Sequence, residues 1–220
     1  MWPYLIHLSE HMWADALTPS WFKYLEPSYS ENNMVDFAVW DDTIKFLAEC
    51  KYTHVLIDVG DAVKYERRPE ISAPNAWAKD FLKKKLDEIR ALGMKPIPKL
   101  NFSTCHDTWL KKYARMTSTE EYYAATSDCI AEVAELFDSP EYFHLGFDEE
   151  IPLYQVNNGY EMCVTRGKTL WWHDPTSSQR NVKSTALARG SGRITIGTTR
   201  KRLLREYPRT YFNLTGSTVS

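Results

Sequence analysis

Four short apolar runs divide the first two thirds of the chain, and each has the length of a β-strand. They are Trp2 to Leu8, His54 to Val59, Pro96 to Phe102 and Tyr142 to Phe147. The runs are almost continuously apolar instead of alternating with polar residues, which is typical of parallel strands buried on both faces. Each is therefore predicted to be a strand of a parallel sheet.

Segments with helical spacing of apolar residues lie between these runs. A first helix is predicted to begin near Asp41, with Asp41 or Asp42 as its cap. A second is predicted after Asn75 and ends at Gly93, a residue type that suits a helix C-terminus. The stretch Ser118 to Glu121 matches a capping box and opens a third, which ends before Pro140.

The order strand, loop, helix repeats four times, and this predicts an α/β fold with right-handed crossovers. Both a (β/α)8 TIM-type barrel and a doubly wound sheet have this order. The barrel is favoured because no strand leads into a Gly-rich phosphate loop, and each strand instead ends in polar or charged residues. A barrel gathers such strand ends on the face where its active sites lie. The first four to five β/α units of a barrel are expected in this chain.

Composition adds that the chain is globular, because 43% of its 220 residues are hydrophobic and 14% are aromatic. No apolar run reaches the length of a membrane span, and the N-terminus does not resemble a signal peptide. We therefore expect a cytoplasmic protein without a membrane partner, and the oligomeric state stays open. The four cysteines have no C-x-x-C spacing and are expected to be reduced and mostly buried.

Charge separates the last part of the chain from the rest. Residues 1–174 contain 18 Lys and Arg against 28 Asp and Glu, whereas residues 175–220 contain 9 against 1. A basic tail is typical of a solvated or nucleic-acid-binding arm. A shift of reading frame near Asp174 is the favoured alternative, because back-translated codons read in another frame restore an aromatic, strand-like composition. Residues 1–174 are thus predicted to be the N-terminal part of a barrel and 175–220 a low-order, out-of-frame tail, with no nucleic-acid partner.

The fourth apolar run stops in three consecutive carboxylates, Asp148, Glu149 and Glu150. Adjacent acids repel one another, so they are found on a solvated surface or where their ionisation is used. They could also form the acidic start of a helix, although Ile151 and Pro152 make a helix start there less convincing. Lys99 and Asn101, inside the third strand, could face the same site or an internal ion pair.

The segment His144-Leu145-Gly146-Phe147-Asp148-Glu149 resembles the His-x-Gly-x-Asp-Glu motif of glycoside hydrolase family 20, the β-N-acetylhexosaminidases. Phe147 replaces the small residue usual in that family. Segments 96–109 and 170–174 also resemble a group of barrel proteins related to such hydrolases. The resemblance implies a (β/α)8 barrel with the motif after strand 4, no cofactor, no metal and a carbohydrate substrate.

The same resemblance implies that Glu149 protonates the glycosidic oxygen and that Asp148 orients the substrate's 2-acetamido group, which attacks the anomeric carbon. Such substrate assistance is an exception to the usual pair of carboxylates acting on water or sugar. Around this pair, polar residues at the ends of strands 2 to 4 are candidates for substrate binding: His144, Glu150, Asp58, Asn101, His106 and Asp107.

Other functions fit parts of the pattern. A metal-dependent barrel hydrolase is possible in principle from His7, His11, Asp58, His106 and Asp148, but strand 1 lacks the His-x-His pair typical of such sites. A non-catalytic carbohydrate-binding barrel, or a truncated barrel without activity, is a third alternative, because four strands do not close a sheet.

Overall fold

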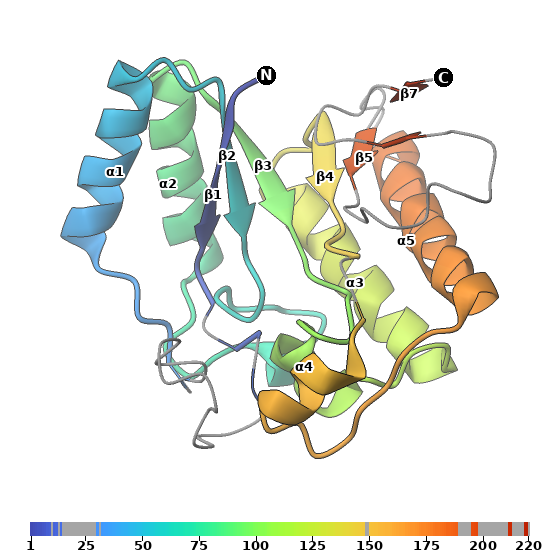
Figure 1. Cartoon of the computed structure of the whole chain (residues 1–220). Coiled ribbons are helices and arrows are strands. Elements are labelled where there is room, and N and C mark those ends of the chain that lie inside the picture. The colour runs from blue at the N-terminus through green and yellow to red at the C-terminus, as the bar shows by residue number, and fades with distance from the viewer. Residues whose placement is uncertain are drawn as a thin grey trace.

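The computed structural model describes residues 1–9, 11–12, 14, 30, 32–147, 150–188, 195–197, 211–212 and 218–219. A parallel sheet runs through this part of the chain, with its strands side by side in sequence order (Figure 1). The strands are β1 (Pro3–His7), β2 (His54–Asp58), β3 (Lys95–Lys99), β4 (Tyr142–His144) and β5 (Thr195–Gly197). The four predicted parallel strands are confirmed, because each apolar run contains one.

Helices follow the first four strands in turn. They are α1 (Phe37–Glu49), α2 (Lys79–Ala91), α3 (Glu120–Leu136), α4 (Pro152–Asn157) and α5 (Lys168–Ala188), with two short 3-10 helices, η1 (Pro69–Ile71) and η2 (Thr108–Tyr113). Figure 1 shows α1 beside α2 and α3 beside α5, with α4 near the carboxyl ends of the strands. A short antiparallel pair, β6 (Tyr211–Phe212) and β7 (Thr218–Val219), completes the described elements.

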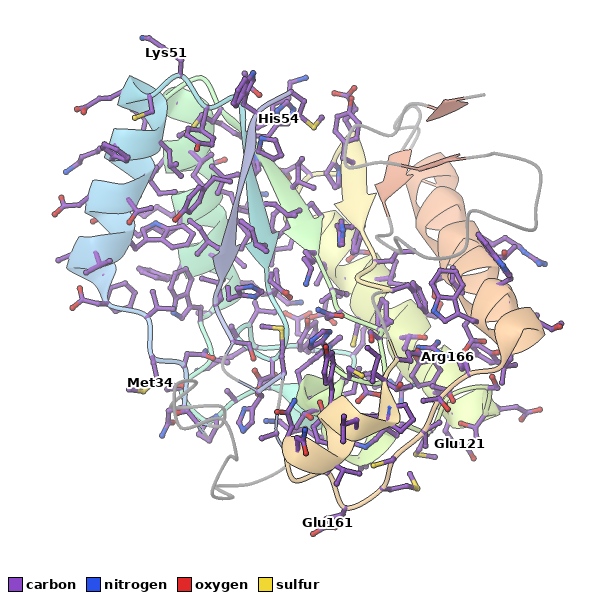
Figure 2. The ribbon with its side chains drawn as sticks, in the orientation of Figure 1. Met34, Lys51, His54, Glu121, Glu161 and Arg166 are labelled. Atoms are coloured by element: carbon purple, nitrogen blue, oxygen red, sulfur yellow. The ribbon has the colours of Figure 1, made fainter. Side chains whose placement is uncertain are left out.

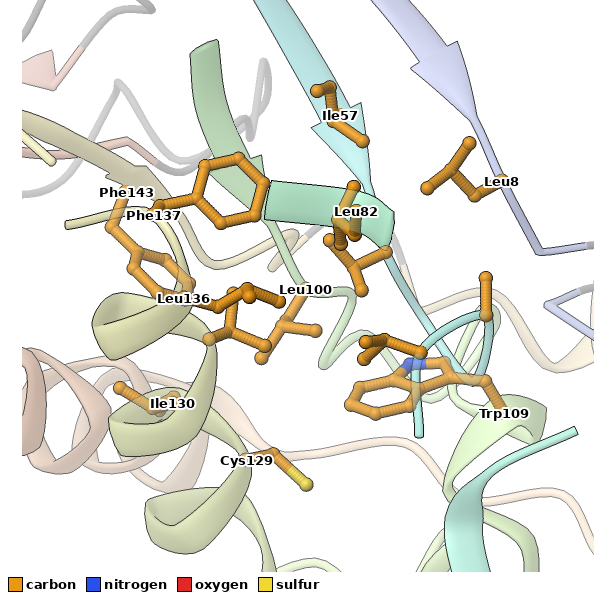
Figure 3. Packing of buried hydrophobic residues seen from close by; sticks show 14 of the residues in the cluster. Leu8, Ile57, Leu82, Leu100, Trp109, Cys129, Ile130, Leu136, Phe137 and Phe143 are labelled. Atoms are coloured by element: carbon orange, nitrogen blue, oxygen red, sulfur yellow. The ribbon is translucent and has the colours of Figure 1, made fainter. Parts of the chain in front are cut away.

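Alternate residues of β2 show which face of the sheet the helices cover. Val55 and Ile57 belong to the main apolar core together with Leu82 and Leu86 of α2, and all four are fully buried. Figure 3 shows Ile57 and Leu82 within this core. Since successive strand residues point to opposite faces, Asp58 points away from the helices. In a barrel of this type that opposite face is the interior.

The helix starts differ in part from those predicted. Asp36, and neither Asp41 nor Asp42, caps α1, because its carboxylate accepts hydrogen bonds from the backbone N–H groups of Ala38 and Val39. Helix α2 begins at Lys79, four residues after the predicted cap. The side chain of Asn75 instead exchanges two hydrogen bonds with the backbone of Asn33. Asn75 therefore joins two loops and does not cap α2, the role that the local sequence predicted for it.

The third helix begins at the predicted place, but its cap is Thr119 and not Ser118, because the Thr119 hydroxyl accepts a hydrogen bond from the backbone N–H of Tyr122. Gly93 also lies after α2 with a φ of +82°, as a helix-ending glycine should. The boundary expected after residue 174 falls within α5, and β5 lies in the segment 175–220.

The four cysteines are free thiols, but only two of them, Cys105 and Cys129, are buried. The expectation that most are buried is therefore wrong for Cys50 and Cys163, which are exposed. Within the described ranges, the helices are all too short or too polar to cross a membrane.

We expect Asp36→Ala to lower the free energy of unfolding by about 0.5–2 kcal/mol, because two N-terminal N–H groups of α1 lose their acceptor. Asp42→Ala is the matched control, since Asp42 is exposed and lies within the helix. Urea unfolding of both variants measures the difference. Equal losses in the two would contradict the assignment of the cap.

Candidate active site

Four polar residues lie in one row across the sheet, where strands β1 to β4 end. The parallel register pairs His7 with Asp58, Asp58 with Lys99, and Lys99 with His144. Residues in register on neighbouring parallel strands point to the same face. All four side chains therefore belong to the face opposite the helices, at the carboxyl edge of the sheet, where active sites of (β/α)8 barrels lie.

A buried ion pair forms the centre of this row. The Lys99 ammonium donates a hydrogen bond to Oδ2 of Asp58, and Nδ1 of His7 lies 3.2 Å from the same oxygen. Burial raises the pKa of the Asp58 carboxyl, but the Lys99 ammonium and His7 lower it by more, so this pKa lies below its ordinary value. The second oxygen, Oδ1, is buried and accepts no hydrogen bond from the residues that the structure describes.

Asn101 links this ion pair to the segment that follows β4. In the amide orientation that satisfies both of its polar groups, Oδ1 accepts from Nζ of Lys99 at 2.7 Å and Nδ2 donates to the carbonyl of Gly146 at 2.6 Å. The backbone N–H of Ser103 donates to the same carbonyl at 3.1 Å. Of the two roles that the sequence left open, Lys99 has that of an internal ion pair, and Asn101 is hydrogen-bonded to it.

The backbone after β4 approaches β3 very closely at Gly146. A Cβ atom at this position would lie 2.7 Å from Cα of Asn101, and the φ of +57° also favours glycine. His144, two residues earlier in the chain, accepts a hydrogen bond from the backbone N–H of Gly146 through its Nδ1 atom at 3.1 Å. These contacts give the chain its direction just before the acid pair.

The predicted catalytic residues, Asp148 and Glu149, lie outside the described residues. The residues on either side of them are buried. The ring of Phe147 packs against Phe102, with ring centroids 5.9 Å apart. Glu150 follows the pair, and its carboxylate accepts hydrogen bonds from both the backbone N–H and the guanidinium of Arg166, at 2.9 and 2.8 Å.

The other two predicted site residues, His106 and Asp107, follow β3. Asp107 is fully buried, and its carboxylate accepts from the backbone N–H of Arg115 at 2.7 Å and from the Arg115 guanidinium at 3.1 Å. His106 is half-buried, and its backbone N–H donates to the carbonyl of Ser103. The structure therefore gathers His144, Asp58 and Asn101 into one group, whereas Glu150 and Asp107 each contact a buried arginine.

A second polar cluster lies beside the row, and the sequence indicated its residues after β1 and β2 only as polar groups at strand ends. Asp61 is fully buried and accepts from Nδ1 of His11 at 2.7 Å and from Nζ of Lys111 at 2.6 Å, as well as from the hydroxyl of Ser9. Burial raises the pKa of the Asp61 carboxyl, but His11 and Lys111 lower it by more, so it lies below its ordinary value. Lys111 comes from η2, 50 residues further along the sequence than Asp61, which is why no local signal could identify it.

The metal-dependent alternative named His7, His11, Asp58, His106 and Asp148. In the part of the chain that the structure describes, no three His, Cys, Asp or Glu side chains converge as metal ligands. His7 contacts Asp58, whereas His11 contacts Asp61. His7 and His11 thus contact two different carboxylates.

Comparison with known proteins identifies the fold. The sequence matches no protein-family model and no curated protein. The structure is similar to a GH20 exo-β-N-acetylglucosaminidase from Vibrio harveyi, with a TM-score of 0.51, 13% identity, and coverage of 73% of this chain and 35% of that one. It is also similar to an N-acetyl-β-hexosaminidase from Streptomyces plicatus, with a TM-score of 0.55, 10% identity and coverage of 93% and 43%.

A β-glucosidase from Thermotoga maritima is similar as well, with a TM-score of 0.57, 11% identity and coverage of 90% of this chain and 48% of that one. These neighbours are TIM-barrel glycosidases, so the parallel α/β fold is the one that they share with this chain. The chain spans less than half the length of each of the three. Its described strands form an open sheet and not a closed barrel.

We expect Gly146→Ala to lower the free energy of unfolding by about 2–4 kcal/mol, because the new methyl group both disfavours a positive φ and meets the backbone of Asn101. Gly93→Ala is the matched control, since Gly93 also has a positive φ but has open space around it. Its loss should be about 1–2 kcal/mol. Urea unfolding compares the two, and a loss at Gly146 no larger than at Gly93 would show that the close approach is not tight.

Lys99→Met should destabilise the protein by about 3–5 kcal/mol at neutral pH, because it leaves the Asp58 carboxylate buried without its ammonium partner. Asp58 has a lowered pKa in the folded protein, so its stabilising effect is present above its unfolded pKa and is lost as the pH falls through the folded one. In the variant, burial raises that pKa, so Asp58 takes up a proton as the pH falls.

The difference in free energy of unfolding between the wild type and Lys99→Met should therefore become smaller when urea unfolding is repeated at about pH 5. Protonation of Asp58 in the variant removes the uncompensated charge. Lys95→Met, on the same strand, should change stability little at either pH because Lys95 is exposed. If Lys99→Met loses the same free energy of unfolding at both pH values, Asp58 is not a buried, charged carboxylate.

Proposed function

We propose that this chain belongs to a glycoside hydrolase that cleaves N-acetylhexosaminides, with Glu149 as the general acid. The observation that carries the proposal is the course of the first four residues of the motif, His144 to Phe147, which run from the last residue of β4 past the carboxyl edge of the sheet. This is the edge on which the buried row of His7, Asp58, Lys99 and His144 lies. The similarity in fold to TIM-barrel glycosidases supports it independently.

The proposed reaction needs two neighbouring acids in different states. Glu149 carries a proton and gives it to the glycosidic oxygen as the bond to the anomeric carbon breaks. Asp148 stays ionised and hydrogen-bonds the N–H of the 2-acetamido group, whose carbonyl oxygen attacks the anomeric carbon. Two adjacent carboxylates raise one another's pKa, which favours one protonated and one ionised member near neutral pH. Water, deprotonated by Glu149, then opens the cyclic intermediate and restores the acetamide.

We propose that Asp58, Asn101 and His144 line the sugar site. Among the described residues, none donates a hydrogen bond to the buried Oδ1 of Asp58, and a sugar hydroxyl is a donor that this oxygen could accept. Lys99 keeps this carboxylate ionised at neutral pH.

Glu150, Asp107 and His106 were expected to contact substrate as well. Because Glu150 and Asp107 each contact a buried arginine, we assign them to support of the site, and we keep His106 as a candidate contact.

A second candidate function is carbohydrate binding without turnover. It is favoured by one observation, that the chain spans less than half the length of the glycosidases that it resembles. Barrels of this class build their sites from loops after many strands, so a chain with fewer strands could retain binding and lose catalysis.

The test is hydrolysis of a chromogenic N-acetylglucosaminide and of the matching glucoside, which lacks the acetamido group. Both are measured with this chain and with any longer gene product that contains it. We expect turnover of the N-acetylated sugar only, and a loss of about 10²–10⁴-fold in kcat for Glu149→Gln, because general acid catalysis of the leaving group is removed. Asp148→Asn should lower kcat on the same substrate.

Glu121→Gln provides the control, since Glu121 is an exposed residue in the first turn of α3 (Figure 2). It should leave kcat unchanged. Turnover of the glucoside as fast as that of the N-acetylated sugar would refute substrate assistance. Sugar binding by calorimetry without any turnover would instead support the second candidate function.

A further inference from the structure

Arg166 is a fully enclosed cation near the carboxyl edge of the sheet. It lies between α4 and α5, and Figure 2 shows it close to α3 and to the start of α5. Its guanidinium is completely shielded from solvent, and so, almost completely, are the carboxylates of Glu150 and Asp174 that it contacts. A charge in such a place is costly unless opposite charges and hydrogen bonds surround it.

The contacts of Arg166 join several segments that are far apart in the sequence. Its guanidinium donates to Glu150 after β4, to the carbonyl of Phe102 after β3, and to Asp174 in α5, where the Nη1 to Oδ2 distance is 2.8 Å. Asp174 also accepts a hydrogen bond from the hydroxyl of Tyr123 in α3. Glu150 and Asp174 bind different edges of the planar guanidinium, through Nε and Nη1 respectively. Arg166 can therefore donate to both carboxylates at once.

Arg166 also contacts both residues that flank the acid pair in the sequence. Glu150, directly after Glu149, is held by the side chain and the backbone N–H of Arg166. Phe147, directly before Asp148, has its ring 5.0 Å from the Arg166 guanidinium carbon, within the range of a cation–π contact. One side chain thus touches the chain immediately before and immediately after Asp148 and Glu149.

We propose that Arg166 is a positioning residue for the Asp148–Glu149 pair, an inference that rests on the proposed function for its catalytic part. By holding Phe147 and Glu150 against one guanidinium, it fixes the two ends of the segment that contains the acids. Misplacement of a catalytic group by about 1 Å can lower a rate by about 100-fold, so such a restraint has a direct kinetic effect. Lysine cannot replace it, since an ammonium has neither the planar face for Phe147 nor the fork of N–H donors that reaches Glu150 and Asp174 from different edges.

The first experiment measures the restraint itself, by hydrogen–deuterium exchange of peptides covering residues 145–151. In Arg166→Met, exchange of these amides should become at least about tenfold faster, because Phe147 and Glu150 both lose their contact with the guanidinium and only the backbone N–H of residue 166 still reaches Glu150. Arg68→Met is the matched control, since Arg68 also pairs with a carboxylate, that of Asp128, and lies over an aromatic ring, that of Tyr113. It should leave exchange in residues 145–151 unchanged.

The second experiment uses turnover of the N-acetylated substrate, at a temperature where each variant is folded by circular dichroism. Arg166→Met should lower kcat by about 100-fold and change KM by less than about threefold, because it disturbs the reacting groups more than ground-state binding. Arg166→Lys should recover little of this loss, and the pH profile of kcat should shift in both variants. Arg68→Met should keep the kcat and the pH profile of the wild type.

The two proposals fail separately. If no protein containing this chain hydrolyses the substrate, the proposed function is lost, and the exchange comparison still decides whether Arg166 restrains the segment. Equal exchange of residues 145–151 in folded Arg166→Met and Arg68→Met would overturn the inference. If Arg166→Met does not fold, Glu150→Gln replaces it, because it weakens the same attachment and leaves the ion pair of Arg166 with Asp174. Unchanged exchange in Glu150→Gln would then overturn it.

Discussion

The ion pair between Asp58 and Lys99 is the interaction around which the carboxyl edge of this sheet is built. Both side chains are buried at the ends of adjacent strands, where an isolated charge would destabilise the fold by several kcal/mol. Their pairing allows β2 and β3 to end in charged residues on the face opposite the helices. The Lys99 ammonium also donates a hydrogen bond to Oδ1 of Asn101, and Nδ2 of Asn101 donates to the carbonyl of Gly146. The ion pair is thus connected through Asn101 to the backbone that follows β4.

Polar groups are distributed very unevenly between the two faces of this structure. The face toward the helices is packed with aliphatic and aromatic side chains such as Ile57, Leu82 and Phe143 (Figure 3). The opposite face has two clusters of buried charges at its carboxyl edge, one around Asp58 and one around Asp61. Apolar packing on one face provides stability, which leaves the carboxyl edge of the other available for groups whose charge has a chemical use.

Local strain is found at the same edge. Lys111 has a φ of 53° and a ψ of −122°, a backbone conformation that is unfavourable for any residue with a side chain, and its ammonium contacts Asp61 and His11. Such conformations cost about 1–3 kcal/mol and persist only where the surrounding contacts enforce them. Three loops, after β1, β2 and β3, therefore meet in an arrangement that tertiary contacts impose against the preference of the local backbone.

The sequence by itself determined the four parallel strands, the helix between each pair and the polar residues at the strand ends. These features follow from continuous apolar runs, helical spacing and turn residues, which act over a few neighbouring positions. It did not determine that Asp36 caps α1, that Asn75 binds Asn33, or that Arg166 joins Phe147 to Glu150. Those partners are separated by many residues, or compete with equally good local partners. Only the packing of the folded chain brings them together, because the burial of a charge selects its partner in space and not in sequence.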